Sequence, residues 1–541
     1  MGVSFFRSFE VFLMLLFFGI TNQGSAQSTK EFKTGTDTLV VYADVPGLAP
    51  SEFYKIRVRS AATKNQWVEC FANITRSLYS TLPADALGTP NSREHYYSYV
   101  KDWSHTYANI EMSKGMPVEV EISSNNGFKI QGKDFSFAAA HPAQKASKPT
   151  VKDNKVYFTI THPAQITIDI NGQLDDTNTG NGYAGAAIHT VSLFANPVIE
   201  KPAMNKMGVF VVKPGETPPS DPNAYKTLIF APGLHNVGRS FKVHPNRNYY
   251  IPGDAIVYGT FNNIGLASGE NTLIYGYGTL CGDKIQHPNY DPARKAGADG
   301  KEWKTIYAEN CKNFRVEGIS IVNPPMHTIN LNASKSKEKE TICKWLKVIT
   351  WRCNGDGIGS AHEISDCFIR TQDDCTYVKG DRKRCVFWTD VNGSVFVLAG
   401  IPTERPIVIE DCDVIYPRHC STKWNGGRIF SKRGPQQAAQ GTTQVNVIFK
   451  DIRVSDKFQT LETFNLYSID KAGKSGAYSG IVFKNISTAK TPSEGDNKIV
   501  GHSQGPWKDL TFDNVVLGNK KVEKMSDFGK IGENVTDLIF K

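Results

Sequence analysis

The second half of the chain repeats a short unit in which apolar, often β-branched residues flank glycine or a small polar residue. The unit recurs at 314–321, 362–369, 407–414, 447–454, 481–486 and 510–515. Its central residues Gly318, Asp366 and Asp411 lie 48 and 45 residues apart, which fits two coils between each pair. Irregular repeats of single strands predict a parallel β-helix, in which each strand pairs with its counterpart one coil away. A β-propeller is the structural alternative, but its blades need strands in groups of four, and the sequence lacks that grouping.

The first half has a different pattern. Between about Thr36 and Ala203, short strands of alternating polarity are separated by turn residues, which is typical of an antiparallel β-sandwich. The proline-rich segment 213–225 connects the two patterns. We therefore expect an all-β protein with an N-terminal β-sandwich (27–205) followed by a right-handed parallel β-helix (206–541).

Residues 1–26 have the pattern of a secretory signal peptide. Arg7 precedes the apolar run 11–20, and the small residues 24–26 offer a cleavage site before Gln27. The apolar run is too short to span a bilayer, and no other segment of the sequence qualifies as a span. The sequence thus predicts a secreted or periplasmic protein with no membrane span.

Charge and cysteine usage exclude several classes of function. The net charge is +9, but the basic runs 335–339 and 379–384 carry no nucleic-acid motif, and we interpret them as solvated loops. Nine of the ten cysteines lie between Cys281 and Cys420, inside the repeat region. Because several share one place in the strand pattern and none forms a C-x-x-C pair, we expect buried core thiols rather than a zinc site. No metal or cofactor is expected, and the chain is expected to be monomeric.

Three carboxylates form the candidate site. Asp356 follows one strand, and the doublet Asp373 and Asp374 follows the next, with Asp356 and Asp373 17 residues apart, close to one coil. Asp390 lies another 17 residues on, so three coils are expected to project polar side chains at one level. Any single aspartate here also fits an ordinary turn. Carboxylates stacked on neighbouring coils, however, raise the pKa of one of them and create the acid and base that glycoside hydrolysis requires.

These segments resemble known families. Asn354-x-Asp356 and Gln372-Asp373-Asp374 are similar to the polygalacturonase signature. The wider context is similar to the dextranase and isopullulanase family, glycoside hydrolase family 49, whose members also carry an N-terminal sandwich. The segments that carry this resemblance are 192–197, 230–233, 275–282, 323–325 and 411–416.

The resemblance implies an inverting endo-hydrolase of α-glucans such as dextran or pullulan, without a metal. It assigns Asp373 as the general acid and Asp356 with Asp374 as the residues that hold and deprotonate the attacking water. The chain departs from the family 49 pattern at Gln372, where a third acidic residue is usual, and segment 395–400 lacks an expected tryptophan. These departures leave the substrate open.

Further residues near the carboxylates are candidates for substrate binding. They are His327, Lys379, Trp388, Asn392, Arg418 and His419. Tyr377 and Trp424 are additional aromatic residues that could stack on sugar rings. The partner implied by all of them is a polysaccharide.

Two other functions fit the sequence. A hydrolase of a uronate-containing or sulfated polysaccharide is favoured by the positive charge and by the Gln-Asp-Asp form of the doublet, and it predicts basic residues such as Lys379, Arg418 or Arg428 along the cleft. A non-catalytic carbohydrate-binding β-helix is the third possibility. It predicts that replacing the aspartates leaves function intact.

Overall fold

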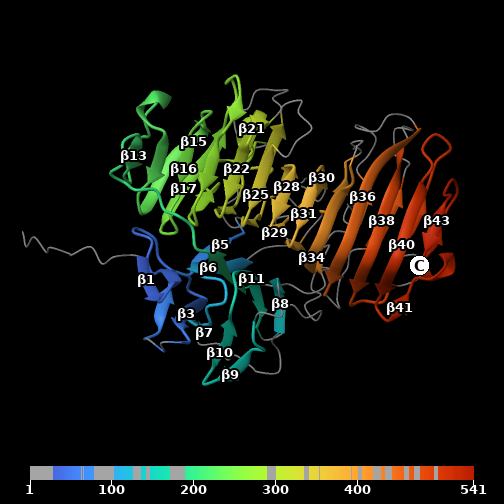
Figure 1. Ribbon diagram of the computed structural model, residues 1–541, viewed down its shortest axis with the longest axis horizontal. Helices are drawn as coiled ribbons and strands as arrows, with labels where there is room; N and C mark the ends of the chain where they lie inside the picture. Colours follow the sequence, from blue (N-terminus) through green and yellow to red (C-terminus); the bar gives the residue numbers. More distant parts are fainter. Residues whose placement is uncertain are drawn as a thin grey trace, which may run out of the picture.

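The computed structural model describes two β domains lying side by side, which Figure 1 displays along the length of the molecule. The described residues are 29–62, 64, 66–77, 103–125, 136–141, 146–170, 189–288, 300–333, 340–352, 354–390, 393–399, 405–417, 428–432, 441–455, 462–467, 476–492 and 497–541. The predicted signal peptide lies outside them. Among the described residues, no helix has the length and apolarity needed to cross a membrane.

The N-terminal domain consists of two packed sheets, as predicted. One sheet contains β1 (Thr29–Thr34), β2 (Asp37–Tyr42), β5 (Asn73–Arg76), β6 (Ser104–Met112), β8 (Ser136–His141), β11 (Ala164–Asp169) and β12 (His189–Pro197). The other contains β3 (Tyr54–Ser60), β4 (Val68–Cys70), β7 (Val118–Ser124), β9 (Thr150–Lys152) and β10 (Lys155–Ile160). All pairs are antiparallel except β6 with β12, which is parallel. Alternate residues such as Val118, Val120 and Ile122 fill the core between the sheets.

The second domain is a parallel β-helix with three faces, and it confirms the predicted fold class. The first face contains β14 (Thr227–Phe230), β16 (Asn248–Tyr250), β19 (Leu273–Tyr275), β22 (Phe314–Glu317), β25 (Thr341–Lys344), β28 (Glu363–Ser365), β31 (Asp381–Lys383) and β43 (Leu538–Phe540). The second contains β15 (Gly233–Lys242), β17 (Ala255–Asn262), β20 (Thr279–Cys281), β23 (Ser320–Val322), β26 (Lys347–Ile349), β29 (Phe368–Thr371) and β32 (Val386–Thr389). The third contains β18 (Gly269–Glu270), β21 (Ile306–Lys312), β24 (Ile329–Ala333), β27 (Ile358–Ser360), β30 (Thr376–Val378), β33 (Phe396–Leu398), β35 (Arg428–Lys432), β37 (Glu462–Tyr467), β39 (Lys498–Val500) and β42 (Lys530–Ile531).

Towards the C-terminal end, longer strands run through the first and second faces without a break. These are β34 (Ile407–Pro417), β36 (Gly441–Val454), β38 (Gly476–Thr488) and β40 (Lys508–Leu517). The remaining elements are β13 (Val209–Val212), which pairs with β14, β41 (Lys520–Lys521), the short helix α2 (Met525–Phe528) and the 3-10 turns η4 (Pro222–Ala224) and η5 (Lys301–Trp303). The change from sandwich to β-helix thus falls between β12 and β13.

The small residue at the centre of the sequence repeat is a corner between the first and second faces. Eight successive coils place a residue with positive φ, between 51° and 81°, at this corner. They are Gly318, Trp345, Asp366, Arg384, Asp411, Asp451, Asn485 and Asn514. Glycine, asparagine and aspartate adopt this left-handed conformation most easily, which explains why they dominate the repeat. The spacings of 48 and 45 residues between Gly318, Asp366 and Asp411 each correspond to two coils. Trp345 and Arg384 are the corner residues of the coils in between.

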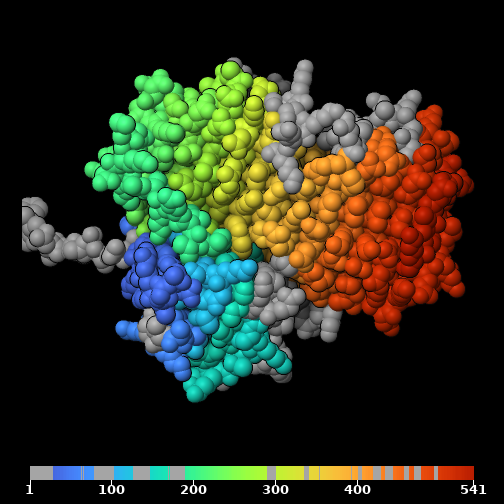
Figure 2. All heavy atoms as spheres, viewed as in Figure 1, coloured from blue at the N-terminus to red at the C-terminus, as the bar shows by residue number. Residues whose placement is uncertain are grey.

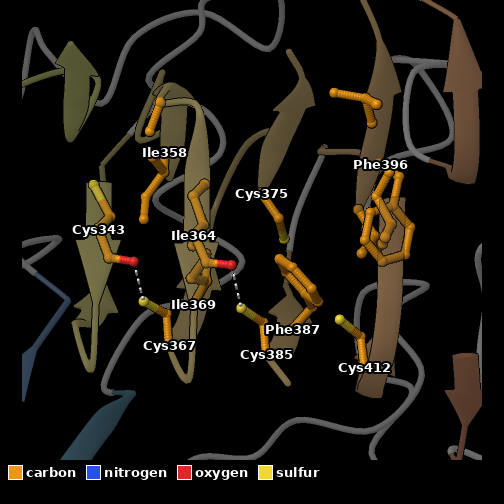
Figure 3. Close-up of a cluster of buried hydrophobic side chains, with 14 of the residues drawn as sticks. Cys343, Ile358, Ile364, Cys367, Ile369, Cys375, Cys385, Phe387, Phe396 and Cys412 are labelled. Atoms are coloured by element: carbon orange, nitrogen blue, oxygen red, sulfur yellow. Dashed lines mark hydrogen bonds between the residues drawn. The ribbon is translucent and has the colours of Figure 1, made fainter. Parts of the chain in front are cut away.

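The residue after each corner points into the β-helix and is fully buried. In sequence order these residues are Ile319, Leu346, Cys367, Cys385, Cys412, Ile452, Ile486 and Val515. Figure 3 shows the thiols of Cys367, Cys385 and Cys412 on successive coils, beside the inward-facing Cys343 and Ile364. All eight cysteines among the described residues are free and buried, which confirms the prediction of core thiols. Burial raises the pKa of Cys375, Cys367 and Cys412, so these thiols stay protonated.

The basic run 379–384 is not a solvated loop, contrary to our prediction. Arg382 pairs in register with Ile364 and Ile409, so its side chain enters the core and has no exposed surface. Its guanidinium donates to the carbonyls of Ala361, Asp381 and Tyr377 and to the Thr376 hydroxyl. Burial lowers its pKa to about 10, which leaves it charged at neutral pH.

The sandwich packs against the second face of the β-helix. Space-filling atoms of the two domains meet along this contact in Figure 2. Phe71, Trp103, Tyr107 and Phe194 of the sandwich share one apolar cluster with outward-facing residues of the β-helix. Those β-helix residues are Ile256, Cys281, Val322, Ile349, Trp351, Phe368, Val386, Trp388, Ile415 and Tyr416. The buried Lys347 adds a polar contact by donating to Asn196 and to the Gly318 carbonyl, and burial holds its pKa well below the usual value.

Substitution at the corner tests the left-handed conformation. Asn485 donates to Asp451 Oδ1 (2.8 Å) and accepts from Asn514 Nδ2 (2.9 Å). Asn485→Gly and Asn485→Val both remove these hydrogen bonds, but only valine is strained at positive φ. We expect the valine variant to be less stable than the glycine variant by about 1–2 kcal/mol in urea unfolding. Equal stability of the two would show that the corner imposes no conformational constraint.

Candidate active site

The candidate carboxylates lie where the chain passes from the second face to the third. Asp356 precedes β27 and Asp374 precedes β30 by the same number of residues, and these two strands pair at Ile358 and Thr376. The Gly357 amide donates to the Asp374 carbonyl (2.8 Å), so the two residues occupy equivalent places on neighbouring coils. The register therefore stacks Asp356 on Asp374 of the doublet, as predicted.

Tyr377 joins the two carboxylates. Its hydroxyl oxygen lies 2.6 Å from Asp356 Oδ2 and 2.9 Å from Asp374 Oδ2. The two carboxylate oxygens are consequently no farther apart than the sum of these distances. Tyr377 is buried, and its ring packs with Val397 and Ala399. It therefore holds the carboxylates rather than presenting its ring to a sugar.

The doublet sits in a tight turn that is fixed on several sides. The Asp374 amide donates to Asp373 Oδ1 (2.9 Å), and the Thr371 hydroxyl donates to the Asp373 carbonyl (2.6 Å). From the next coil, the Ser394 amide donates to Asp374 Oδ1 (2.9 Å). A Cβ on Gly393 would lie 1.9 Å from the Asp373 backbone, so only glycine allows this close approach. Both members of the doublet remain partly exposed.

Of the predicted binding residues, His327 lies beside a carboxylate, and Lys379 follows β30 and contacts the neighbouring strand β27. His327 Nδ1 is 3.5 Å from Asp356 Oδ2, and its side chain is partly exposed. Lys379 Nζ is 3.4 Å from the Ser360 hydroxyl at the end of β27. Burial lowers the pKa of Lys379, and the neighbouring charges of Lys304 and Arg382 add to this. The site therefore combines carboxylates with a histidine, and Lys379 lies at the ends of the two strands that follow them.

Asp390 does not belong to the carboxylate group, contrary to our prediction. The residue in register with Asp374 is Ser394, because the Cys375 amide donates to the Ser394 carbonyl. Asp390 is instead the counterpart of Gln372 on the next coil. It is buried and forms an ion pair with Arg370 (Nε to Oδ2 2.7 Å). Its other oxygen accepts from Trp388 Nε1 (2.6 Å). The spacing of 17 residues misplaced it because the turn after β32 is longer than the turn after β29.

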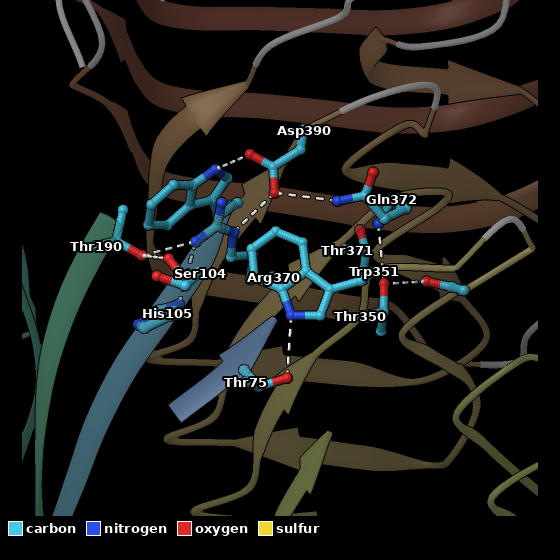
Figure 4. A network of polar contacts seen from close by, with 12 residues as sticks. Thr75, Ser104, His105, Thr190, Thr350, Trp351, Arg370, Thr371, Gln372 and Asp390 are labelled. Carbon is cyan, nitrogen blue, oxygen red and sulfur yellow. Dashed lines mark hydrogen bonds and ion pairs between the residues drawn. The ribbon is translucent and has the colours of Figure 1, made fainter. Parts of the chain in front are cut away.

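Arg370 is the centre of a buried network between the domains, which Figure 4 shows. Its guanidinium carbon lies 3.8 Å from the Trp388 ring centre and 4.5 Å from that of Trp351. Nη1 donates to Thr190 Oγ1 (2.8 Å) and to His105 Nδ1 (3.2 Å) on the sandwich. Burial and the Arg370 charge lower the pKa of His105 well below the usual value, so its imidazole is neutral. His105 then has a bare Nδ1 that accepts from Arg370, and its protonated Nε2 donates to Ser192 (2.8 Å).

The same network reaches the backbone of the two turns that carry the carboxylates. Thr350 Oγ1 accepts from the Gln372 amide (2.9 Å) and donates to the Gly355 carbonyl (2.9 Å), which links the segments just before Asp373 and Asp356. Trp351 Nε1 donates to Thr75 Oγ1 of the sandwich (3.0 Å). The sandwich thus supports both turns from outside the β-helix, as Figure 4 makes visible.

The remaining predicted residues divide into two groups. Trp388 is 1% exposed and lies in the domain interface, so it cannot stack on a sugar; this prediction was wrong because an aromatic residue that faces a second domain has the same sequence pattern as one that faces a cleft. Asn392, Arg418, His419 and Trp424 lie outside the described residues. Across the part of the chain that the structure describes, no group of histidine, cysteine or acidic side chains could hold a metal ion.

Sequence reasoning gave Tyr377 a different role, as a residue that stacks on a sugar, and it did not find the contributions of Ser394, Arg370 and Arg382. Tyr377 has the right distance from the doublet for a hydrogen bond only once the strand β30 is known to turn its side chain outward. Ser394 contributes through its backbone amide, which no side-chain motif reveals. Arg370 and Arg382 are buried on opposite sides of the sheet, although arginine is usually exposed.

Breaking the buried ion pair tests how much the turns depend on the interface. Arg370→Met leaves Asp390 charged and buried, so we expect a loss of about 3–5 kcal/mol in unfolding free energy. The double variant Arg370→Met/Asp390→Asn should regain part of this loss, because asparagine can still accept from Trp388. Urea unfolding of the wild type, both single variants and the double variant gives the coupling energy.

A matched control is available on the same two coils, at the corners before β29 and β32. Arg384 and Asp366 make an ion pair of the same length (2.7 Å), but Arg384 is 44% exposed. Arg384→Met should cost about 1 kcal/mol or less. A similar cost for Arg370→Met and Arg384→Met would contradict the role of Arg370 as a buried support.

Comparisons with known proteins show what the fold is similar to. No protein-family model and no curated protein sequence matches the chain. Dex49A from Penicillium minioluteum superposes with a TM-score of 0.70 over 94% of this chain and 100% of that chain, at 14% identity. The family 28 exopolygalacturonase of Yersinia enterocolitica has a TM-score of 0.38 and 14% identity, over 93% of this chain and 97% of that chain. The polygalacturonase of Erwinia carotovora has a TM-score of 0.38 and 16% identity, over 63% of this chain and 98% of that chain.

The superposition on Dex49A includes both the sandwich and the β-helix, because it leaves out only a small part of either chain. The resemblance indicated by the sequence motifs is therefore confirmed at the level of the fold. This chain has the two-domain fold of Dex49A.

Proposed function

We propose that the protein is a glycoside hydrolase that cleaves a polysaccharide with inversion at the anomeric carbon. The observation that carries the proposal is the convergence of Asp356 and Asp374 on one tyrosine hydroxyl, with the partly exposed Asp373 on the same turn. A group of carboxylates at an exposed turn, supported from both domains, is the arrangement that acid and base catalysis of glycoside cleavage requires. The shared fold with Dex49A and the family 49 resemblance of the motifs favour an α-glucan such as dextran as the substrate.

In this mechanism the three aspartates have two roles. Asp373 donates its proton to the glycosidic oxygen as the bond to the anomeric carbon breaks. Water attacks that carbon from the opposite side, and its proton passes to the carboxylate pair Asp356 and Asp374. The Ser394 amide donates to Asp374, which favours its ionised form as a base. We assign the binding of sugar hydroxyls to His327, which faces Asp356, and to Lys379, which contacts Ser360 at the end of the neighbouring strand.

A second substrate class has an observation in its favour. Burial lowers the pKa of Lys379, and the positive charges of Lys304 and Arg382 lower it further. An anionic group of a uronate or a sulfated sugar would relieve this repulsion. We therefore keep the acidic polysaccharide as the alternative substrate. Export through the N-terminal segment is part of the proposal, because the polysaccharides considered as substrates lie outside the cell.

A reducing-end assay on dextran, pullulan, polygalacturonate and a sulfated galactan tests the function. We expect the wild-type protein to release reducing ends from one α-glucan in the panel. Asp373→Asn keeps the shape of the side chain but removes the proton donor, so kcat should fall by about 10²–10⁴-fold. The fold should remain, because Asp373 is partly exposed and its backbone contacts survive the change.

The matched control is Asp366→Asn, which changes a carboxylate at the other end of β29, where it pairs with Arg384. It should retain wild-type kcat. Activity of Asp373→Asn equal to that of the control would remove Asp373 from the acid role. Activity on polygalacturonate or the sulfated galactan alone would replace the α-glucan by the acidic polysaccharide, and binding without cleavage across the panel would favour the non-catalytic alternative.

A further inference from the structure

The hydroxyl of Tyr377 faces two carboxylate oxygens at once. It lies 2.6 Å from Asp356 Oδ2 and 2.9 Å from Asp374 Oδ2. A phenol has one proton, so it can donate fully to only one of them at a time. When both carboxylates are ionised, the second contact therefore brings a phenol lone pair near a negative oxygen. When one carboxyl is protonated, it can donate to the phenol oxygen, and both contacts become hydrogen bonds.

The tyrosine is held so that it cannot turn away from this position. Its ring packs against Val397 and Ala399 on the outside of the third face. From inside the β-helix, Arg382 Nη2 donates to the Tyr377 carbonyl (2.6 Å), and Arg382 Nε donates to Thr376 Oγ1 (3.0 Å). Arg382 is fully buried and also binds the Ala361 carbonyl (3.1 Å), so it ties β30 to the end of the preceding coil. A buried cation thus fixes the backbone from which the hydroxyl is aimed.

We propose that Tyr377 is a positioning residue that stabilises the Asp356 and Asp374 pair in the state that has accepted one proton. This inference rests on the proposed hydrolase function for its kinetic consequence. In the general-base step an O–H bond of water breaks, its electron pair forms the new bond to the anomeric carbon, and the proton passes to the pair. The pair then has two hydrogen bonds to Tyr377 where it had one, and the tyrosine itself is unchanged.

The other charged groups around the pair are the same with or without the hydroxyl. His327 faces Asp356 from the turn before β24, Asp373 lies on the turn of the doublet, and Lys379 and Lys304 lie on the third face. Removing only the oxygen of Tyr377 therefore isolates its effect. The pair would bind its first proton less tightly without the second hydrogen bond, so that proton would be taken up at lower pH.

Tyr377→Phe tests the inference in the full-length protein. On the polysaccharide that the wild type cleaves, kcat should fall by about 10- to 100-fold, as expected for one hydrogen bond to a charged group in the transition state. KM should stay within about twofold of the wild-type value, because the buried hydroxyl does not contact substrate. The acidic limb of the pH profile of kcat should move to lower pH. A purely structural role predicts a loss of activity with an unshifted limb, and that result would overturn the proposal.

The control is Tyr157→Phe in the sandwich, where the same kind of hydroxyl donates to Glu121 Oε2 (2.9 Å). It should leave kcat and the pH profile as in the wild type, and urea unfolding of both variants reports whether the fold is retained. Wild-type kcat and an unshifted pH profile in Tyr377→Phe would overturn the role of Tyr377 while the hydrolase function stands.

A second readout does not need catalysis. Infrared difference spectra between the wild type and Tyr377→Phe, recorded across a pH titration, follow the band of a protonated carboxyl group. We expect this band to appear at lower pH in the variant. If the wild type cleaves none of the polysaccharides but the band shifts, the proposed function fails and the role of Tyr377 in pairing the carboxylates stands. If the band does not shift, the pairing is overturned whatever the activity.

Discussion

The register between neighbouring coils determines where every functional side chain lies. In a parallel β-helix, each residue is hydrogen-bonded through its backbone to its counterpart one coil away, so residues in equivalent positions stack at the spacing of strands, about 4.8 Å. Asp356, Asp374 and Ser394 are such a series, and the amides of Gly357 and Cys375 connect them. Because this stacking is made by the backbone, it brings two carboxylates together without any favourable contact between them. The surrounding residues then have to stabilise a cluster of like charges, which explains the donors that converge on it.

Two buried arginines support the turns that carry the carboxylates from opposite sides. Arg370 lies outside the β-helix, between two tryptophan rings and the sandwich, whereas Arg382 lies inside the core beneath β30. Desolvating a guanidinium is costly, and each cation offsets this cost with hydrogen bonds, to Asp390 in one case and to backbone carbonyls in the other. Removing either cation would leave acceptors unpaired in the interior. The sandwich is therefore part of the support of the site as well as a separate domain.

The sequence predicts those features that depend on short-range pattern. The apolar strand repeat identifies the β-helix, and the corner residues repeat because a left-handed turn selects glycine, aspartate and asparagine. Asp356 and the doublet come together because Asp356 and Asp374 each lie two residues before their strands on the third face, β27 and β30, which pair in register. Two predictions are wrong for reasons that a local pattern does not show. Asp390 is misplaced because the turn after β32 is longer, and Trp388 is misassigned because it faces the other domain. The prediction that segment 379–384 is a solvated loop is wrong for another reason. Arg382 is a charged residue in an inward position, which contradicts the polarity pattern of a strand.

The buried thiols have a consequence for how this protein can be studied. Cys343 and Cys367 lie in the core of the coils that carry the carboxylates, Cys385 and Cys412 lie in the core of the next two coils, and all four are buried in the closed structure. A thiol-reactive reagent can modify them only when these coils separate, so the rate of modification measures the free energy of local opening. Cys70 lies in the core of the sandwich and reports on that domain by the same chemistry. The natural cysteines thus distinguish a protein whose domains open one by one from a protein in which the sandwich and the central coils of the β-helix open together.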